Sequence, residues 1–550
     1  MKRHAWLPSM LSLACLVLLA APAGAQTQAK MAPHPSAANP GCTGQPSVPP
    51  PPSEAIQNAL RLYRAHKFDA AIQSYKTIIA TNTDLGDGYA GLARVYLREK
   101  DLDAAFNAAT LGIKADPTSP DANAAMGEVY FRAGELHKAE EAFLAPVRAC
   151  WPNARAYYGL ARIYEATSNF RRARAAIDEA HSLDPSDPEI GRAWMETLPR
   201  DERIKYLKAH LAIETNGDGE ERSRLQRSLA LLENETPEQH NSCRLVSNVI
   251  PAESNLDELL SDPYHRRGYA LRVELNGAPA RLLVDTGSSG ILIDRRIAEK
   301  AHVTPVTAHE VHGIGDSGAQ SGYIGYADSL QVGALEFRGC YVDVVDSKSV
   351  ADSDGLIGAD VFSDFLVELD FPDAKFKLSP LPPGPPPSPR EPTALDSSAA
   401  GDTNLRDRYI APEMDSYIRA YRFGHALLIP TRLNNRVTKL FLIDTGAFDD
   451  TISPRAAKEV TKISRDGQTR VHGMSGAVKD VYRADRVTLQ FGHFEQKRWD
   501  LVTFDLTRMS DGFGTEISGT LGFAMLQLLD IRIDYRDGLV DFRYDENRLH

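Results

Sequence analysis

The sequence predicts a multidomain protein with an all-α repeat region followed by an all-β region that is present twice. Three observations predict this class. Helix-forming residues recur with a period of 34 residues between Glu54 and about Asn234. Short β-type runs punctuated by glycine begin after about Ser242. Landmarks in the first β-rich segment then return in the same order, 159 to 164 residues later.

The first residues have the pattern of an export signal. The basic pair Lys2-Arg3 precedes an apolar run from Leu11 to Ala21, and the small residues Ala23-Gly24-Ala25 follow. This pattern is typical of a signal peptide over residues 1–25, with cleavage near Ala25. The apolar run is shorter than the roughly 20 residues that a bilayer requires, and no later run is long enough. We therefore expect an exported chain, periplasmic or secreted, with no membrane span.

Composition limits the function classes. The chain has 550 residues, of which 43% are hydrophobic and 25% charged, so it can bury several cores. Its net charge of −12 argues against nucleic acid as a partner, because phosphate binding needs a basic field.

Four cysteines remain after cleavage: Cys42, Cys150, Cys243 and Cys340. An oxidising compartment permits disulfides, and four cysteines allow three pairings, all of which stay open at this point. None of the four has metal-ligand spacing, so we expect no metal and no cofactor.

The helical region is a repeat array. Residues 26–53 form a proline-rich lead-in that we expect to be disordered, and the repeats occupy residues 54–235. Three sets of residues recur at intervals of 34: Tyr96, Tyr130 and Tyr164; Phe68, Leu102, Leu136 and Phe170; and Ala71, Ala105, Ala139 and Ala173. A small residue held at this period, where two helices cross, resembles the tetratricopeptide repeat. The resemblance implies a solenoid whose groove binds a protein partner or an extended peptide.

The β-rich region consists of two copies. The first is expected over residues 262–380 and the second over 411–546, with a stiff proline-rich linker over 381–410. Three landmarks pair between the copies: Asp285 with Asp444, Val311-His312-Gly313 with Val471-His472-Gly473, and Leu356-Ile357-Gly358 with Thr520-Leu521-Gly522. Constant order and nearly constant offset indicate a duplicated domain.

Each copy places an aspartate after an apolar run and before Thr-Gly, at Asp285-Thr286-Gly287 and Asp444-Thr445-Gly446. Two carboxylates held close together cannot both ionise, so they share one proton. Such a pair can take a proton from water while it polarises a peptide carbonyl. Gly287 and Gly446 would allow a partner backbone to approach closely, and the hydroxyls of Thr286 and Thr445 can hold the opposing loop.

These motifs resemble the aspartic peptidases, and each copy is closer in length to the retropepsin-like group than to a pepsin lobe. The resemblance implies two β-barrel lobes, a catalytic dyad of Asp285 and Asp444, and support from Thr286, Gly287, Thr445 and Gly446. It also implies glycine-rich flaps that close over a bound peptide, at Gly313-Ile314-Gly315 and Gly473-Met474-Ser475-Gly476. Thr520 replaces Leu356 in the second copy, where it would be a weaker packing element.

The expected function is that of an exported aspartic endopeptidase acting on peptides or unfolded protein, with the repeats recruiting substrate or a partner. A peptide-binding scaffold without catalysis is the alternative. The sequence leaves open whether the dyad forms within one chain or between chains.

Overall fold

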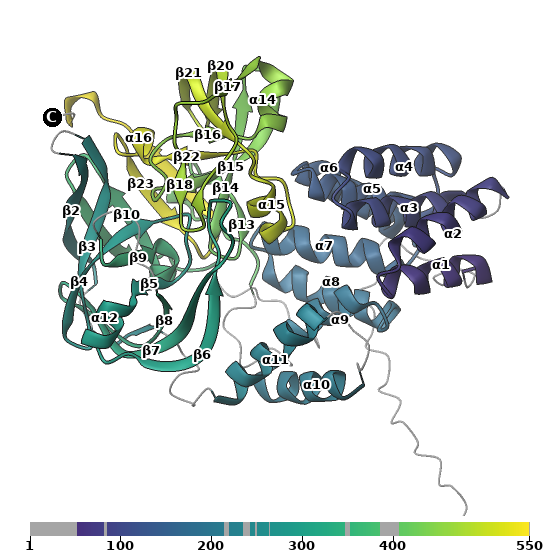
Figure 1. The fold of residues 1–550 in the computed structure, drawn as a ribbon, viewed down its shortest axis with the longest axis horizontal. Coiled ribbons are helices and arrows are strands. Elements are labelled where there is room, and N and C mark those ends of the chain that lie inside the picture. Colours follow the sequence, from purple (N-terminus) through teal and green to yellow (C-terminus); the bar gives the residue numbers. More distant parts are fainter. Residues whose placement is uncertain are drawn as a thin grey trace, which may run out of the picture. The chain divides into compact units, whose positions relative to one another are not determined.

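The structure, a computed structural model, describes residues 52–81, 85–213, 219–234, 243–247, 250–262, 265–346, 353–385 and 406–548. The expected signal peptide, Cys42, nearly all of the lead-in and most of the linker lie outside the described residues. Helices come first along the chain and strands follow (Figure 1). The predicted fold class is confirmed by this order and by the pairing of the helices and strands.

The N-terminal region is a stack of helix pairs. Its helices are α1 Glu54–Arg64, α2 Phe68–Ala80, α3 Leu85–Arg98, α4 Leu102–Ala115, α5 Pro120–Arg132, α6 Leu136–Arg148, α7 Ala154–Ala166, α8 Phe170–Leu183, α9 Pro188–Glu196, α10 Arg200–Ile213 and α11 Gly219–Asn234. The second helix of each of the first four pairs begins at one recurring set, Phe68, Leu102, Leu136 and Phe170. Ala71, Ala105 and Ala139 are fully buried, because only a small side chain fits where two helices touch.

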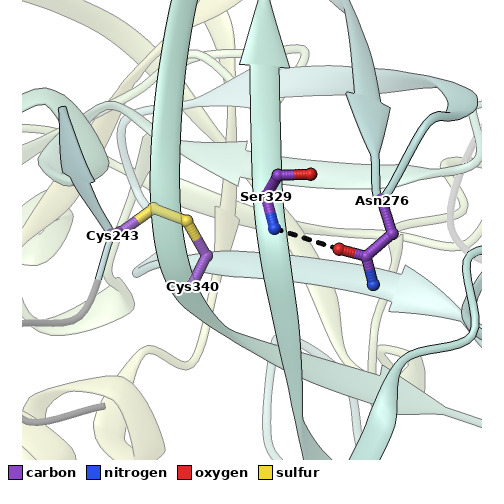
Figure 2. The surroundings of a disulfide bond; sticks show 4 residues. All are labelled: Cys243, Asn276, Ser329 and Cys340. Carbon is purple, nitrogen blue, oxygen red and sulfur yellow. Dashed lines mark hydrogen bonds between the residues drawn. A yellow bond between two sulfur atoms is a disulfide. The ribbon is translucent and has the colours of Figure 1, made fainter. Parts of the chain in front are cut away.

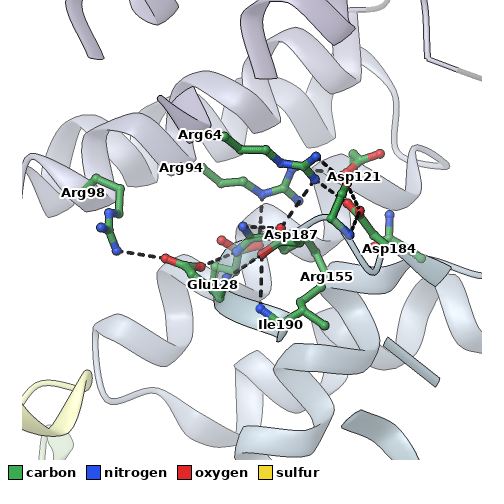
Figure 3. A network of polar contacts seen from close by, with 12 residues as sticks. Arg64, Arg94, Arg98, Asp121, Glu128, Arg155, Asp184, Asp187 and Ile190 are labelled. Atoms are coloured by element: carbon green, nitrogen blue, oxygen red, sulfur yellow. Dashed lines mark hydrogen bonds and ion pairs between the residues drawn. The ribbon is translucent and has the colours of Figure 1, made fainter. Parts of the chain in front are cut away.

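A network of ion pairs links the first helices of successive pairs (Figure 3). Arg94 on α3 contacts Asp121 at 3.2 Å and Glu128 at 3.0 Å, both on α5. Arg155 on α7 contacts Asp187 at 2.6 Å, just before α9, and Glu189 at 2.5 Å. The facing carboxylates raise the pKa of the buried Arg94 and Arg155 guanidiniums against the effect of burial. Since these charges are paired, the network fixes the stacking of the helices.

The first β-rich copy, lobe 1, contains β1 Arg244–Leu245, β2 Ala252–Asp262, β3 His265–Leu275, β4 Ala278–Asp285, β5 Ile291–Asp294, α12 Arg295–Lys300, β6 Thr304–Val311, β7 Gln320–Val332, β8 Leu335–Val345, β9 Gly355–Gly358, η1 Ala359–Phe362, β10 Phe365–Asp370 and β11 Lys375–Pro380. Strands β1 and β2 precede the start expected at residue 262. They belong to this lobe, because β1 pairs with β8 and β2 pairs with β3 and β11.

The second copy, lobe 2, contains η2 Pro412–Met414, β12 Ile418–Arg419, β13 Tyr421–Phe423, β14 Ala426–Leu433, β15 Val437–Asp444, β16 Thr451–Ile452, α14 Pro454–Val460, β17 Ile463–Asp466, β18 His472–Gly473, β19 Gly476–Ala477, β20 Val481–Phe491, β21 Phe494–Phe504, α15 Thr507–Phe513, β22 Gly519–Gly522, α16 Phe523–Leu526, β23 Asp530–Asp534, β24 Leu539–Arg543 and η3 Glu546–Arg548. The strand order from β14 to β22 repeats that of lobe 1 from β3 to β9, as the duplication predicts, with the β18–β19 hairpin and α15 as additions.

In each lobe, the strand that ends in the motif aspartate is buried and lies parallel to the apolar-apolar-Gly strand. β4 pairs with β9 so that Asp285 lies opposite Gly358, and β15 pairs with β22 so that Asp444 lies opposite Gly522. A parallel pair needs a long crossover, and the flap, helix and hairpin between the two strands supply it. The expected packing element therefore lies directly beside each aspartate.

One sheet joins the two lobes. Strand β10 of lobe 1 pairs with β23 of lobe 2 from Leu366↔Asp534 to Asp370↔Asp530, so the order runs β12-β24-β23-β10-β11-β2. The sequence did not predict this joint. An aspartate closes the hairpin turn in each lobe: the Asp373 N–H donates to Asp370 Oδ1, and the Asp537 N–H donates to Asp534 Oδ1 at 3.0 Å.

Cys243 and Cys340 form a disulfide beside β1 and β8 (Figure 2). This resolves one of the open pairings. In the same region the Ser329 N–H donates to Asn276 Oδ1 at 3.0 Å. Within the described part of the chain, no helix is both long and apolar enough to cross a membrane. The same residues contain no group of three or more His, Cys, Asp or Glu side chains placed to hold a metal ion.

Candidate active site

The structure brings Asp285 and Asp444 together within one chain. Both are almost fully buried, at 8% and 6% exposed, at the ends of β4 and β15. Each carboxyl group lies against the glycine that follows the other aspartate, and the charge of Asp285 acts on Asp444. The alternative of a dyad completed by a second chain is therefore unnecessary.

The two threonines hold the loops together reciprocally. The Thr286 N–H donates to Thr445 Oγ1 and the Thr445 N–H donates to Thr286 Oγ1, both at 3.1 Å. Each hydroxyl then donates across to the strand of the other lobe: Thr286 to the Ile443 carbonyl at 2.9 Å and Thr445 to the Val284 carbonyl at 2.8 Å. All of these groups are buried, so the four bonds fix the distance between the two aspartates.

Gly287 and Gly446 make room for a carboxylate, not for the partner backbone that the sequence suggested. A Cβ on Gly287 would lie 2.7 Å from Asp444 Cγ, and a Cβ on Gly446 would lie closer still to Asp285 Cγ. Real Cβ atoms do not approach that closely. Each glycine therefore leaves free the space that the opposite aspartate occupies.

The two carboxyl groups differ in their donors. Asp285 accepts from the Gly287 N–H at 2.8 Å and from the Ser288 hydroxyl at 2.7 Å, one donor on each oxygen. Asp444 accepts from the Gly446 and Ala447 N–H groups, at 3.1 and 2.8 Å, both on Oδ1. Ala447 stands where lobe 1 has Ser288, so Asp444 gains no hydroxyl.

This difference in donors separates the pKa values of the two carboxyl groups. Burial and the neighbouring Asp285 charge raise the pKa of Asp444 to about 7. Burial also raises the pKa of Asp285, but the Ser288 hydroxyl, the Gly287 N–H and nearby His425 oppose that effect. Asp285 is therefore the first of the pair to ionise, and Asp444 retains the proton.

The flap residues of the two lobes contact each other. In lobe 1, Gly313-Ile314-Gly315 lies at the tip between β6 and β7; in lobe 2, Gly473-Met474-Ser475-Gly476 forms the β18–β19 hairpin. The Gly313 N–H donates to Ser475 Oγ at 3.1 Å, and the Ser475 N–H donates to the Ile314 carbonyl at 2.9 Å. Gly315 and Gly476 have φ of +129° and +85°, which favour glycine.

Each flap tip packs on the apolar surface of the opposite side. Met474 of lobe 2 packs on a lobe 1 cluster that includes Leu283 and Leu356. Ile314 of lobe 1 packs on the cluster shared by lobe 2 and the repeat array. The Arg508 guanidinium on α15 donates to the Gly315 carbonyl at 3.1 Å. The flaps are thus joined to each other and to α15.

Sequence reasoning missed two residues of this site. Ser288 follows the first motif directly, and a comparison with Ala447 at the same place in the second would have revealed it. His425 lies between β13 and β14, and its Nε2 is 3.3 Å from the Gly287 carbonyl. No local motif marks His425, because only the fold brings it to the loop.

Thr520 is not the weaker packing element that the sequence suggested. It is fully buried, and its hydroxyl bonds to the Thr451 hydroxyl at 2.8 Å. Thr520 and Thr451 are cross-strand partners, as Leu356 and Leu292 are in lobe 1. The polar side chain in lobe 2 therefore has its partner.

Fold and site define a class: a repeat array followed by a bilobal domain whose paired Asp-Thr-Gly loops face each other. A family model described as Aspartyl protease matches residues 271–361 and 429–524, once in each lobe. A Tetratricopeptide repeat model matches residues 56–120 and 124–188. The chain is a tetratricopeptide array fused to a duplicated aspartic-protease-like domain.

Two solved structures are similar to parts of the chain. An aspartic proteinase from Irpex lacteus is 13% identical, with 54% of this chain and 98% of that chain covered and a TM-score of 0.31. A thermophilic TPR protein of Thermus thermophilus is 19% identical, with 32% and 97% covered and a TM-score of 0.27. No curated protein sequence matches the chain.

Proposed function

We propose that the protein is an aspartic endopeptidase whose dyad is Asp285 and Asp444. One observation supports this most directly: two buried carboxyl groups from duplicated loops lie close together, each against the glycine of the other loop, and the reciprocal threonine bonds hold them in place. A cleft that only binds peptides has no use for a paired acid. Thr286, Gly287, Thr445 and Gly446 would act as positioning residues.

The difference in donors assigns the two roles. The Asp285 carboxylate takes a proton from a water molecule, whose oxygen forms a bond to the peptide carbonyl carbon. Asp444 gives its proton to the carbonyl oxygen, so a neutral tetrahedral gem-diol results. Collapse of this intermediate breaks the C–N bond, and the leaving nitrogen receives a proton from Asp285 while Asp444 recovers its own. Water is thereby added across the peptide bond, and the dyad returns to its starting state.

The activity should have a bell-shaped pH dependence. Asp285 must be ionised, and its pKa lies above the ordinary 3.8. Asp444 must keep its proton, and its pKa is about 7. The rate should therefore rise with pH as Asp285 ionises and fall as the pH passes about 7, where Asp444 loses its proton. A kcat/KM profile from about pH 3 to 9 measures both limbs; constant activity above about pH 8 would contradict this assignment.

The direct test replaces one acid. Asp285→Asn in the full chain should lower the cleavage of an unfolded protein substrate by about 10³-fold or more, because it removes the base. Asp328→Asn is the matched control, since Asp328 is exposed on β7. Far-UV circular dichroism and melting temperature establish that both variants fold. Full activity of Asp285→Asn would refute the proposal; pepstatin binding without turnover by the unaltered chain would favour the scaffold.

We also propose export and recruitment. The disulfide between Cys243 and Cys340 supports an oxidising compartment. The repeat array supports recruitment of a peptide or protein, because stacked repeats of this kind form a concave binding surface. N-terminal sequencing of protein recovered from a bacterial periplasm tests the first: a chain beginning near Gln26 is expected, and one retaining Lys2 and Arg3 in the cytoplasm is not.

A further inference from the structure

A pocket of about 350 Å³ lies where the repeat array meets lobe 2. Its lining comes from two sources. Helices α5 and α7 supply Phe131, Arg162, Glu165 and Ala166, and lobe 2 supplies residues 422–425, 512 and 513. Helix α7 lies against β13, and the ring of Phe131 meets that of Phe423 edge-on, with centroids 6.0 Å apart. Neither part forms this pocket alone.

Two guanidiniums in the pocket lack a carboxylate partner. Arg162 lies over the Phe131 ring at 3.8 Å and donates weakly to the Gly514 carbonyl at 3.4 Å. Arg422 donates only to the carbonyls of Gly424 and Tyr535, both at 2.9 Å. Among the described residues, no carboxylate lies within ion-pair distance of either one.

This differs from the arginines elsewhere in the array. Arg94 and Arg155 each contact two acids, whereas Arg162 contacts none among the residues that the structure describes. Burial lowers the pKa of Arg422, and the more distant charges of Asp360, Glu165 and Asp534 oppose that effect only in part. Glu165 is the one acid in the lining, so the two guanidiniums leave the pocket positive.

The pocket adjoins the dyad through His425. The His425 ring lines the pocket, lies 5.8 Å from the Phe513 ring between centroids, and places Nε2 3.3 Å from the Gly287 carbonyl. Gly287 belongs to the loop that carries Asp285. A single side chain, that of His425, therefore separates a group held in the pocket from the loop that carries Asp285.

We infer that this pocket is a specificity subsite for a peptide carboxylate, which Arg162 of the array and Arg422 of lobe 2 bind together. The inference rests on the proposed function for its role in cleavage, but the binding itself is independent of turnover. A guanidinium with free N–H groups pairs well with a carboxylate. The carboxylate comes either from an acidic side chain or from the C-terminus of the peptide.

The test measures binding to the full-length Asp285→Asn variant, which cannot cleave. Fluorescence anisotropy compares pairs of peptides that are acetylated at the N-terminus and amidated at the C-terminus. The members of a pair differ in having one Glu or one Gln at the same position, and this position is moved along the peptide from pair to pair. A further pair contains no Glu, and its members differ in ending in a free carboxylate or in an amide. We expect at least one acidic form to bind roughly tenfold more tightly than its neutral match. Arg162→Gln should reduce that ratio to near one.

Arg61→Gln is the matched control, because Arg61 is exposed on α1 and far along the array; the ratio should not change. Arg162→Lys should keep part of the preference, which separates lost charge from lost folding. Equal binding of the acidic and neutral forms of every pair would overturn the inference, as would a preference that Arg162→Gln leaves intact. Binding preference without cleavage by the unaltered chain would refute the proposed function and leave the subsite standing.

Discussion

The two lobes share a backbone plan but differ in the chemistry around their aspartates. Ser288 gives Asp285 a hydroxyl donor, whereas Ala447 gives Asp444 none. Leu292 faces Leu356 in lobe 1, and Thr451 faces Thr520 in lobe 2. Both copies thus keep the Thr-Gly residues that position the carboxyl groups, but they differ in the hydrogen-bond donors that affect the pKa of each carboxyl group. Two loops with one backbone plan therefore surround their carboxyl groups with different donors.

The loops are also braced in opposite ways. In lobe 1, Asp360 follows the apolar-apolar-Gly strand and accepts from the Gly290 N–H and the Ser289 hydroxyl of the loop. In lobe 2 the acid is in the loop: Asp450 accepts from the Gly522 N–H of the strand at 2.8 Å. Burial raises the pKa of Asp450 to about 6. In both lobes an aspartate thus links the loop after the motif to the apolar-apolar-Gly strand, but the aspartate comes from the strand side in lobe 1 and from the loop in lobe 2.

The largest expected effect on stability comes from breaking the reciprocal threonine hydrogen bonds, which both lobes share. Thr286→Val leaves a buried N–H and a buried carbonyl without partners, so the free energy of unfolding should fall by about 2 to 5 kcal/mol. Thr445→Val should cost about as much, because the bonds are reciprocal. Thr286→Ser, which keeps the hydroxyl, is the control. Urea unfolding measures all three, and unequal losses from the two valine variants would show that the lobes are not equivalent here.

A second prediction concerns the two glycines. Gly446→Ala places a methyl group closer to the Asp285 carboxyl group than Gly287→Ala places one to Asp444, whose nearest atom would lie 2.7 Å away. Both should displace a carboxylate and lower kcat/KM, by about 10²-fold for Gly446→Ala and less for Gly287→Ala. Gly277→Ala would be strained by its φ of +79°, so Gly467→Ala, with nothing near its Cβ, is the better control. The reverse order of the two losses would contradict this geometry.

A third prediction tests the exchanged pair. Thr520→Val leaves the Thr451 hydroxyl buried without its partner and should destabilise the fold by about 1 to 3 kcal/mol. The double variant Thr451→Val/Thr520→Val replaces both with groups of the same shape and should recover most of that loss. Additive losses in this double-mutant cycle would mean that the hydroxyls act separately.

The smallest expected effects are shifts in the pH–rate profile, which should distinguish the ionisation of Asp285 from that of Asp444. Ser288→Ala removes a donor from the Asp285 carboxylate, so its pKa rises and the acid limb of the rate profile moves up, by about one pH unit or less. Ala447→Ser adds a donor to Asp444, so its pKa falls and the alkaline limb moves down. Each substitution should leave the other limb in place. A shift of both limbs by either change would refute the separate roles.

Much of the site could be predicted from the sequence, because its residues are neighbours along the chain. The apolar run, the aspartate and Thr-Gly follow one another, and the duplication doubled the signal. The 34-residue period likewise located the second helix of each repeat at Phe68, Leu102, Leu136 and Phe170. Such patterns arise from backbone periodicity and from side chains that neighbours along the chain must bury.

The sequence by itself determined that there are two aspartates, two lobes and an array, since repetition needs no coordinates to be seen. Tertiary structure alone decided that the aspartates pair within one chain, that β10 and β23 join the lobes, that His425 contacts the dyad loop, and that Arg162 lines the same pocket as His425. Those contacts join residues that are far apart along the chain. They depend on how the apolar faces pack, and no local pattern records that packing.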